Sequence, residues 1–356
     1  SRNFWCNVKG IGSWSLTGHS AEELSKKFTE MQDDSEVTAG FMWQKTTRES
    51  KKYQLRGEIL SFIPVDKNVE IMLVTITNTG RMAQTVTPTA AIPLYGRSAD
   101  NIRDHRHVTS LLHRIETTDT GVLVTPTLSF DERGHQVNHM TYYCVGWSGN
   151  GEKPVDFYPT AEDFVGEGGN FERPYATVKN AEGVKAGTKI EGLEAVGGLH
   201  FSEITLEPEE ECSYLIFTGI TEDIQEIRNL SKTYTTREKV LEELEKTKAY
   251  WQEKVNVAYH TGDSDFNQFM HWVSFQPILR RIYGCSFLPH HDYGKGGRGW
   301  RDLWQDCLAL LIMNPDGVRQ MLLDNFAGVR IDGSNATIIG SKQGEFVADR
   351  NNITRV

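Results

Sequence analysis

The first two-thirds of the chain carry hydrophobic residues in the spacing of β-strands. Residues 53–63 and 69–77 are rich in β-branched and aromatic side chains, and the polar, proline-containing segment 64–68 separates them. This pattern predicts an antiparallel hairpin. In its second strand both alternating sets of positions are largely apolar, so we expect burial on both faces of the strand. The two sets are Ile71, Leu73 and Thr75, and Met72, Val74 and Ile76.

The strand pattern continues to about residue 222. Further strand-like segments lie at residues 85–93, 139–147, 199–206 and 213–219. Clusters of Gly, Asn, Asp and Pro separate them, with no helical periodicity between. This succession is typical of an antiparallel sandwich and not of a parallel α/β sheet. We therefore predict a large, double-layered β-sandwich.

After Thr221 the hydrophobic period changes from two to about 3.6, which predicts helices. The first covers residues 237–255, and we expect its buried stripe to contain Leu241, Leu244, Trp251 and Val255. On another face, Glu242 and Lys246 have the spacing of an i,i+4 ion pair.

Three more helices are predicted further along, at residues 263–283, 302–313 and 317–326. Ser264 is the expected cap of the first, and Pro277 is expected to kink it. A polar tail follows from Ile331. The predicted division is a sandwich domain at 1–222, a helical linker at 223–262 and a helical domain at 263–356.

Residues 289–306 concentrate more chemically useful side chains than any other stretch. Four glycines loosen this loop, which runs directly into an apolar helix. Helical spacing places Asp302, Gln305, Asp306 and Ala309 on one face, and Trp304, Leu308 and Leu311 are expected to point inward. The loop also carries the cations Lys295, Arg298 and Arg301.

Two interpretations of this loop are open. Acids near a helix N-terminus are stabilised by the helix dipole, so the segment could be only a capped core helix. The mixture of guanidinium, carboxylate, amide and indole groups is what a sugar and a phosphate require. Because these groups lie on one loop, we favour a binding site.

Composition and charge limit the classes of partner that the protein can bind. A chain of 356 residues with 38% hydrophobic content can bury a large core, and its net charge of −10 argues against nucleic acid. The five cysteines are widely spaced without a CxxC pair, which supports neither a disulfide framework nor a zinc site. We find no membrane-length apolar run and no signal peptide, so we predict a cytoplasmic protein without a membrane partner.

Other motifs in the sequence give little support for a cofactor or metal site. Residues 294–299 match G-x-G-x-x-G, but the dinucleotide fingerprint requires a preceding strand in a βαβ unit. His105, His107 and His113 lie among arginines, yet their spacing does not suit a helical pair of histidine ligands. A solvated or interface-facing loop is favoured there, and no metal site is predicted.

Residues 296–306, Gly-Gly-Arg-Gly-Trp-Arg-Asp-Leu-Trp-Gln-Asp, resemble the signature of phosphorylases in glycoside hydrolase family 94. Within that family, residues 288–306 and 344–355 resemble most closely the 1,2-β-oligoglucan phosphorylases and the phosphorylase-like part of cyclic β-1,2-glucan synthases. The resemblance implies an α+β multidomain fold. Its parts are an antiparallel β-supersandwich, linker helices and the first helices of an (α/α)6 barrel that is incomplete in this chain.

The reaction implied by the resemblance is reversible, inverting phosphorolysis of a β-glucosidic bond, which gives α-glucose 1-phosphate. Inorganic phosphate is a substrate, and no cofactor is implied. Phosphate takes the place of the activated water of an inverting glycosidase, so one protein acid suffices to protonate the leaving oxygen. By position in the motif, Arg298 resembles the phosphate-binding arginine, and Arg301 and Asp302 resemble the pair that holds the glucose hydroxyls. Gln305 and Asp306 are further substrate-site candidates.

The general acid implied by the family lies downstream of Val356, so no catalytic residue is assigned here. The 356 residues are accordingly expected to belong to a longer polypeptide and to be inactive alone, with exposed apolar helix faces. The expected partners are an oligosaccharide, phosphate and the remainder of the polypeptide, and a homodimer is left open. Two other functions remain open: an inverting β-glucan hydrolase on the same fold, and a non-catalytic carbohydrate-binding module.

Overall fold

The computed structural model describes residues 2–96, 109–131, 134–283, 298–335, 338–339, 346–347 and 354–355. These residues fall into two compact units that divide between Thr247 and Lys248, with Phe130 and Asp131 grouped with the second. We call the first the sandwich unit and the second the helical unit. The predicted domain limits at residues 222 and 262 stay a prediction.

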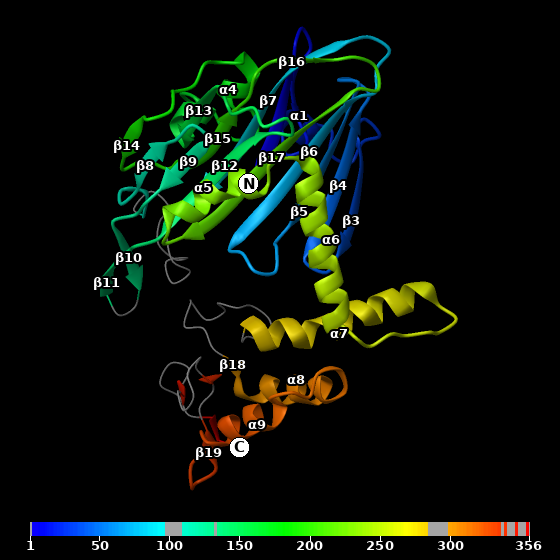
Figure 1. Cartoon of the computed structure of the whole chain (residues 1–356), viewed down its shortest axis with the longest axis vertical. Helices are drawn as coiled ribbons and strands as arrows, with labels where there is room; N and C mark the ends of the chain where they lie inside the picture. Colours follow the sequence, from blue (N-terminus) through cyan, green and yellow to red (C-terminus); the bar gives the residue numbers. More distant parts are fainter. Residues whose placement is uncertain are drawn as a thin grey trace. The chain divides into compact units, whose positions relative to one another are not determined.

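Two antiparallel sheets make up most of the sandwich unit (Figure 1). In spatial order, the six-stranded sheet contains β13 (Asp156–Thr160), β15 (Ala195–His200), β7 (Gln84–Leu94), β1 (Asn3–Val8) and β2 (Gly12–Ser15), with β16 (Ile204–Leu206) also paired to β7. The nine-stranded sheet contains β14 (Lys189–Glu191), β8 (Arg114–Thr117), β9 (Gly121–Val124), β12 (Thr141–Ser148), β17 (Glu211–Thr221), β6 (Val69–Asn78), β5 (Leu55–Phe62), β4 (Trp43–Ser50) and β3 (Asp34–Gly40). A separate hairpin pairs β10 (Leu128–Asp131) with β11 (Gly134–Val137).

Each sheet has two apolar faces, and helices cover the outer ones. Among the described residues, the helices are α1 (Ala21–Ser25), α3 (Ala161–Val165), α4 (Tyr175–Lys179), α5 (Ile224–Thr233), α6 (Arg237–Lys254), α7 (Ser264–Tyr283), α8 (Trp300–Met313) and α9 (Val318–Phe326). The core between the sheets includes Cys6 and Val86 from one sheet and Val74 and Ile216 from the other. This layering explains why so many strands lack a polar face.

The outer face of the nine-stranded sheet packs against α5 and the first part of α6. Ile71 and Leu73 of β6 belong to the same buried cluster as Leu230 of α5 and Val240 and Leu244 of α6. Helix α5 begins where the Asp223 carboxylate accepts a hydrogen bond from Gln225 N at 2.9 Å, a standard N-cap. On the outer face of the six-stranded sheet, α3 and α4 contribute the corresponding cover.

The sequence predicted this architecture well at its strongest strands. The hairpin at residues 53–77 is confirmed as β5 and β6, with Leu60 opposite Leu73. Both faces of β6 are buried, as the alternation predicted. The predicted strand at 199–206 is instead two short strands, β15 and β16, which both pair with β7.

Helix α6 corrects two details of the predicted pattern. Its buried positions are Val240, Leu244, Thr247 and Trp251, and Val255 is buried just after its end, whereas Leu241 is only half-buried. The predicted pair of Glu242 with Lys246 is wrong. Glu242 pairs with Lys239 at 2.9 Å and Lys246 with Glu243 at 3.5 Å, because i,i+3 neighbours are as close on a helix surface as i,i+4 neighbours.

The helical unit contains α7, α8 and α9 (Figure 1). Asp263, and not the predicted Ser264, caps α7, because its carboxylate accepts hydrogen bonds from Asp265 N and Phe266 N at 2.9 and 3.1 Å. Pro277 lies inside this helix. Among the helices that the structure describes, none has both the length and the apolar composition of a transmembrane span.

Candidate functional site

The predicted binding segment forms a junction between a short strand and a helix. Arg298 lies in β18 (Arg298–Gly299), and the next residue, Trp300, begins α8. Arg301 and Asp302 are therefore in the first turn of α8, and Gln305 and Asp306 are one turn further along. The backbone thus brings all five predicted site residues to the junction of β18 and α8 and the first two turns of that helix. The side chains of Arg298, Arg301, Asp302 and Asp306 lie outside the described part of the structure.

A small antiparallel sheet fixes the approach to this junction. Arg298 pairs with Ile339 of β20 (Ile338–Ile339), and β20 pairs in turn with β21 (Phe346–Val347). Residues 346–347 come from the polar tail, so the tail returns to within two strands of Arg298. Two-residue strands carry no detectable period, and sequence reasoning therefore missed this sheet. A second pair joins β19 (Ser334–Asn335) to β22 (Thr354–Arg355).

The orientation of α8 differs from the prediction. Cys307, Leu310 and Met313 form the buried stripe, whereas Leu308 and Leu311, which were expected to point inward, are 68% and 53% exposed. The prediction was wrong because residues 307–313 are apolar on every face, so periodicity could not select the inner one. Gln305 is exposed, as expected for a residue on the binding face.

Contacts with neighbouring segments hold α8 in its second turn and at its C-terminal end. The ring of Trp304 meets that of Phe326 edge-on, with centroids 4.3 Å apart. Asn256 Nδ2 donates to Met313 O at 2.8 Å, and Arg281 donates to Asn314 O and Asp316 O at 3.2 and 2.9 Å. These donors satisfy carbonyls at the end of α8, and the arginine charge also favours the negative end of the helix dipole. The opposite end of α8 carries the site residues.

His113 is the one member of the predicted histidine cluster that the structure describes, since residues 101–108 lie outside it. It is buried, with Nδ1 3.1 Å from Leu193 O and Nε2 accepting from Gly96 N at 3.3 Å. Burial lowers the pKa of His113 below its usual value, which favours the neutral ring that accepts this hydrogen bond. His113 therefore stabilises the fold. No group of three or more His, Cys, Asp or Glu side chains in the described residues could hold a metal ion.

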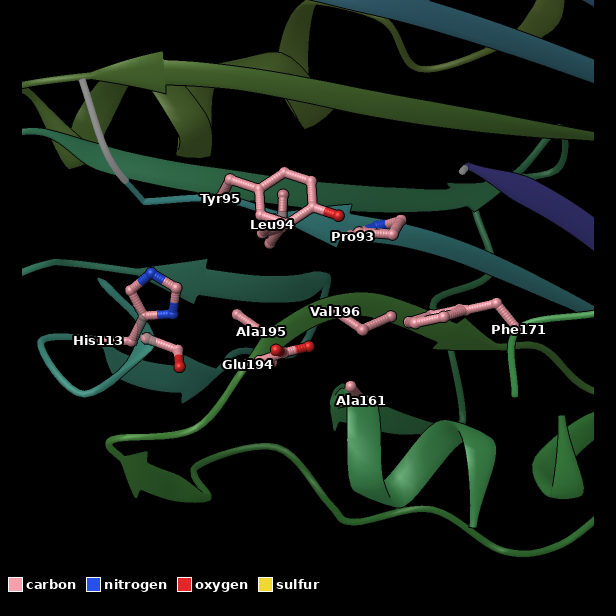
Figure 2. Close-up of a pocket in the computed structure, with 10 residues that line it drawn as sticks. Pro93, Leu94, Tyr95, His113, Ala161, Phe171, Glu194, Ala195 and Val196 are labelled. Atoms are coloured by element: carbon pink, nitrogen blue, oxygen red, sulfur yellow. The ribbon is translucent and has the colours of Figure 1, made fainter. Parts of the chain in front are cut away.

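A pocket beside His113 is too small for a sugar. It lies at the ends of β7 and β15, between Tyr95, Phe171 and Glu194 (Figure 2). Its free volume is about 10 Å³, which is space for a single water molecule. The loop at 284–297, which holds Lys295 and the first four residues of the G-x-G-x-x-G match, lies outside the described residues.

Comparison with solved structures supports the fold. A bacterial glucoamylase solved in complex with acarbose has a TM-score of 0.50 and 10% sequence identity, and the match covers 94% of this chain and 45% of that one. A family GH92 α-mannosidase from Bacteroides thetaiotaomicron has a TM-score of 0.38 and 11% identity, and the match covers 77% of this chain and 31% of that one. At this level of identity the glucoamylase match shows a shared fold alone.

Comparison of sequences points to one family. The cyclic β-(1,2)-glucan synthase NdvB of Rhizobium meliloti (strain 1021) is 26% identical over 194 residues, which are 53% of this chain and 6% of that protein. The chain thus spans a small part of this relative. Residues 12–237 match the glycosyl hydrolase 94 supersandwich domain, which is well over half of the chain. By that match, the chain belongs to glycosyl hydrolase family 94.

Proposed function

We propose that the protein takes part in inverting phosphorolysis of β-glucosidic bonds, with β-1,2-linked glucose oligomers as substrate and α-glucose 1-phosphate as product. The observation that carries this proposal is the junction of β18 and α8, which gathers Arg298, Arg301 and Asp302 at the N-terminal end of one helix. Membership of family 94 is consistent with it. The choice of the β-1,2 linkage rests on the sequence resemblance and on the name of the glucan synthase relative.

The start of α8 offers what both substrates need. A helix N-terminus presents free backbone N–H groups and a partial positive charge, which favour an anion such as phosphate. In this proposal Arg298 adds a guanidinium that binds two phosphate oxygens. Asp302 accepts hydrogen bonds from glucose hydroxyls, Arg301 donates to them, and Gln305 and Asp306 support this pair.

The proposed step is a single displacement. A phosphate oxygen attacks the anomeric carbon on the face opposite the glycosidic oxygen, and the bond from that carbon to the leaving sugar breaks. A general acid supplied by another part of the polypeptide protonates the leaving oxygen. One inversion converts the β-linkage to an α-phosphate, so the stereochemistry of the product follows from the geometry of attack.

We also propose that the helical unit is the beginning of an (α/α)6 barrel. Its helices leave large apolar side chains exposed, including Phe269 and Trp272 of α7 and Leu308 and Ile312 of α8. Exposed residues of this size along neighbouring helices are typical of a face that packs against other helices. The remaining helices of a barrel would cover that face.

The test is release of glucose 1-phosphate from a linear β-1,2-linked glucose oligomer by the protein at its natural length. We expect release that requires inorganic phosphate and that falls about a hundredfold or more in Arg298→Ala, since a charged hydrogen-bond partner of the attacking group is removed. Glu207→Gln, on the surface of the sandwich unit, is the control and should leave the rate unchanged. Absence of phosphate-dependent product from β-1,2-, β-1,3- and β-1,4-linked oligomers would exclude the proposal.

Hydrolysis is the second candidate, because the structural match is to a glucoamylase. The same assay separates the two reactions. A hydrolase would release free glucose at a rate independent of phosphate, whereas a phosphorylase would release little free glucose.

A further inference from the structure

The sandwich unit contains an open groove that the proposed reaction does not use. Three segments line it: the turn after β12, the connection between β15 and β16, and the start of β17. Its volume is about 340 Å³, within the range of roughly 300–1,000 Å³ that small-molecule sites occupy. All of the lining residues lie between Ser148 and Tyr214, so the groove is complete within the sandwich unit.

Hydrogen bonds within the protein fix one wall of the groove. Ser148 Oγ accepts hydrogen bonds from Asn150 N and Glu152 N at 3.3 and 3.0 Å, which closes the turn. Gly149 N donates to Ser213 O at 2.7 Å and ties the turn to β17. A Cβ at Gly149 would lie 2.1 Å from Ser213 Oγ, so a larger residue there would require the Ser213 hydroxyl to rotate away. The exposed side chains of Asn150 and Glu152 are therefore presented at the groove by a preorganised backbone.

Two of the residues that line the groove are aromatic and uncharged, Phe201 and Tyr214. The rings of Phe201 and Tyr214 pack with centroids 4.6 Å apart, and both belong to the core between the sheets. Burial raises the pKa of Tyr214 far above its usual value, so its hydroxyl stays protonated. Cys212 and Ser213 also line the groove.

The charges of the groove limit what it can bind. Two of its four glutamates are in ion pairs, Glu203 with Lys9 at 3.4 Å and Glu211 with Arg237 at 3.2 Å. Lys153 also lines the groove, and its charge is paired with Asp119. Glu210 accepts from Glu207 N within its own turn, at 2.8 Å. Excess negative charge disfavours phosphate and other anions. The carboxylates are also not gathered in the way a metal ion needs, as the described residues show no such cluster.

A neutral polyhydroxylated ligand satisfies these constraints. Its hydroxyls can donate to Glu152 and to Glu210, and the Asn150 amide can both donate and accept. We infer that this groove is a second binding site for the neutral glucose oligomer, on residues separate from the α8 junction. The identity of the sugar rests on the proposed function, whereas the existence of the site rests on the groove.

The experiment measures binding of a linear β-1,2-linked oligomer of about six glucose units to the protein at its natural length by calorimetry. We expect two binding events in the wild type and one in the double variant Asn150→Ala/Glu152→Gln, because loss of charged and amide partners weakens a site by about tenfold or more. Glu207→Gln removes the same charge on a neighbouring turn and should retain both events. Thermal unfolding of all variants should be unchanged, since the substituted side chains are exposed.

Kinetics separate this inference from the proposed function. In the double variant we expect KM for long oligomers to rise severalfold, with kcat and the KM of the disaccharide unchanged. One binding event in both proteins, or equal KM values, would overturn the inference even if phosphorolysis occurs. A third outcome is that the wild type binds the glucan, the double variant does not, and neither releases glucose 1-phosphate. That result would support the groove as a binding site and reject the proposed function. The inference would also be overturned if the groove bound a polyamine in a salt-sensitive manner and did not bind the oligomer.

Discussion

Strand β6 and helix α8 are both strongly apolar, yet they are buried to very different degrees. In β6, Ile71 and Leu73 face the helices α5 and α6, while Met72, Val74 and Ile76 face the second sheet. In α8 only one stripe is buried, and Ile312 is 80% exposed. The difference shows that β6 is covered on both faces within the sandwich unit, whereas the described part of the helical unit leaves one side of α8 exposed.

The largest expected effect is on the proposed activity and concerns the N-terminal end of α8. Asp302→Asn keeps the shape of the side chain and removes its charge, so we expect kcat/KM for phosphorolysis to fall about 10²- to 10³-fold. The melting temperature should change little. A variant with normal activity would show that the start of α8 has a structural role only. The difference between α8 and β6 would then be a difference in packing and not in function.

The next effect tests the closed packing of the sandwich unit. Leu215 of β17 is fully buried and lies opposite Leu73 of β6. Leu215→Ala should lower the free energy of unfolding by about 2–5 kcal/mol, from lost burial and the cavity left behind. Denaturant titration measures this change, and a loss below about 1 kcal/mol would mean that the sandwich repacks easily.

A pair of substitutions in α8 sharpens the comparison directly. Leu310→Ala, at a fully buried position, should cost about 2–4 kcal/mol. Ile312→Ala should cost less than about 0.5 kcal/mol in the 356-residue chain, because its side chain is exposed. At natural length the second substitution should become costly if further helices cover α8. If Ile312→Ala has the same small effect on the free energy of unfolding at both chain lengths, that result would argue against the proposed barrel.

Acid should act on the sandwich unit through His113. Burial lowers the pKa of His113 in the folded protein, so the unfolded chain binds the proton more readily. The stabilising contribution is present above the unfolded value of about 6.5 and is lost as the pH falls below it. The drop in melting temperature from pH 7.5 to 5.5 should shrink in His113→Gln and stay unchanged in His139→Gln, which alters an exposed histidine. An equal drop in all three proteins would assign the acid sensitivity to other groups.

The smallest effect is expected at the surface of α6. Glu242 and Lys239 form an exposed ion pair, and such pairs contribute about 0.2–0.5 kcal/mol. Glu242→Gln should therefore change stability by no more than about 0.5 kcal/mol in urea titration. A cost above 1 kcal/mol would mean that this surface is covered by another part of the protein.

The sequence predicted the elements whose pattern is repeated over many residues. The hairpin of β5 and β6 and the helices α6 and α7 have enough apolar positions to define a period. The short helices α3 and α4 have five residues each and were not predicted, because they are held by packing on the six-stranded sheet. Propensity has little influence at that length.

For the proposed site, the sequence predicted the position of the segment at the start of a helix, whereas the role of its residues stays a prediction. Residue chemistry identified Arg298 to Asp306 as one segment, and the structure places it at the start of α8. The exposed face of α8 could not be predicted, because Leu308 and Leu310 are identical in the sequence and differ only in their surroundings. The sheet that joins Arg298 to Ile339 depends on contacts across about forty residues, which no local pattern records.

The pairing of Arg298 with Ile339 has a consequence for engineering. Helices α8 and α9 lie between two backbone positions that sit side by side in one small sheet. The whole segment can therefore be exchanged as a cassette between relatives if its two ends keep that pairing. If the proposed function holds, a graft of this kind would test whether the segment determines sugar preference.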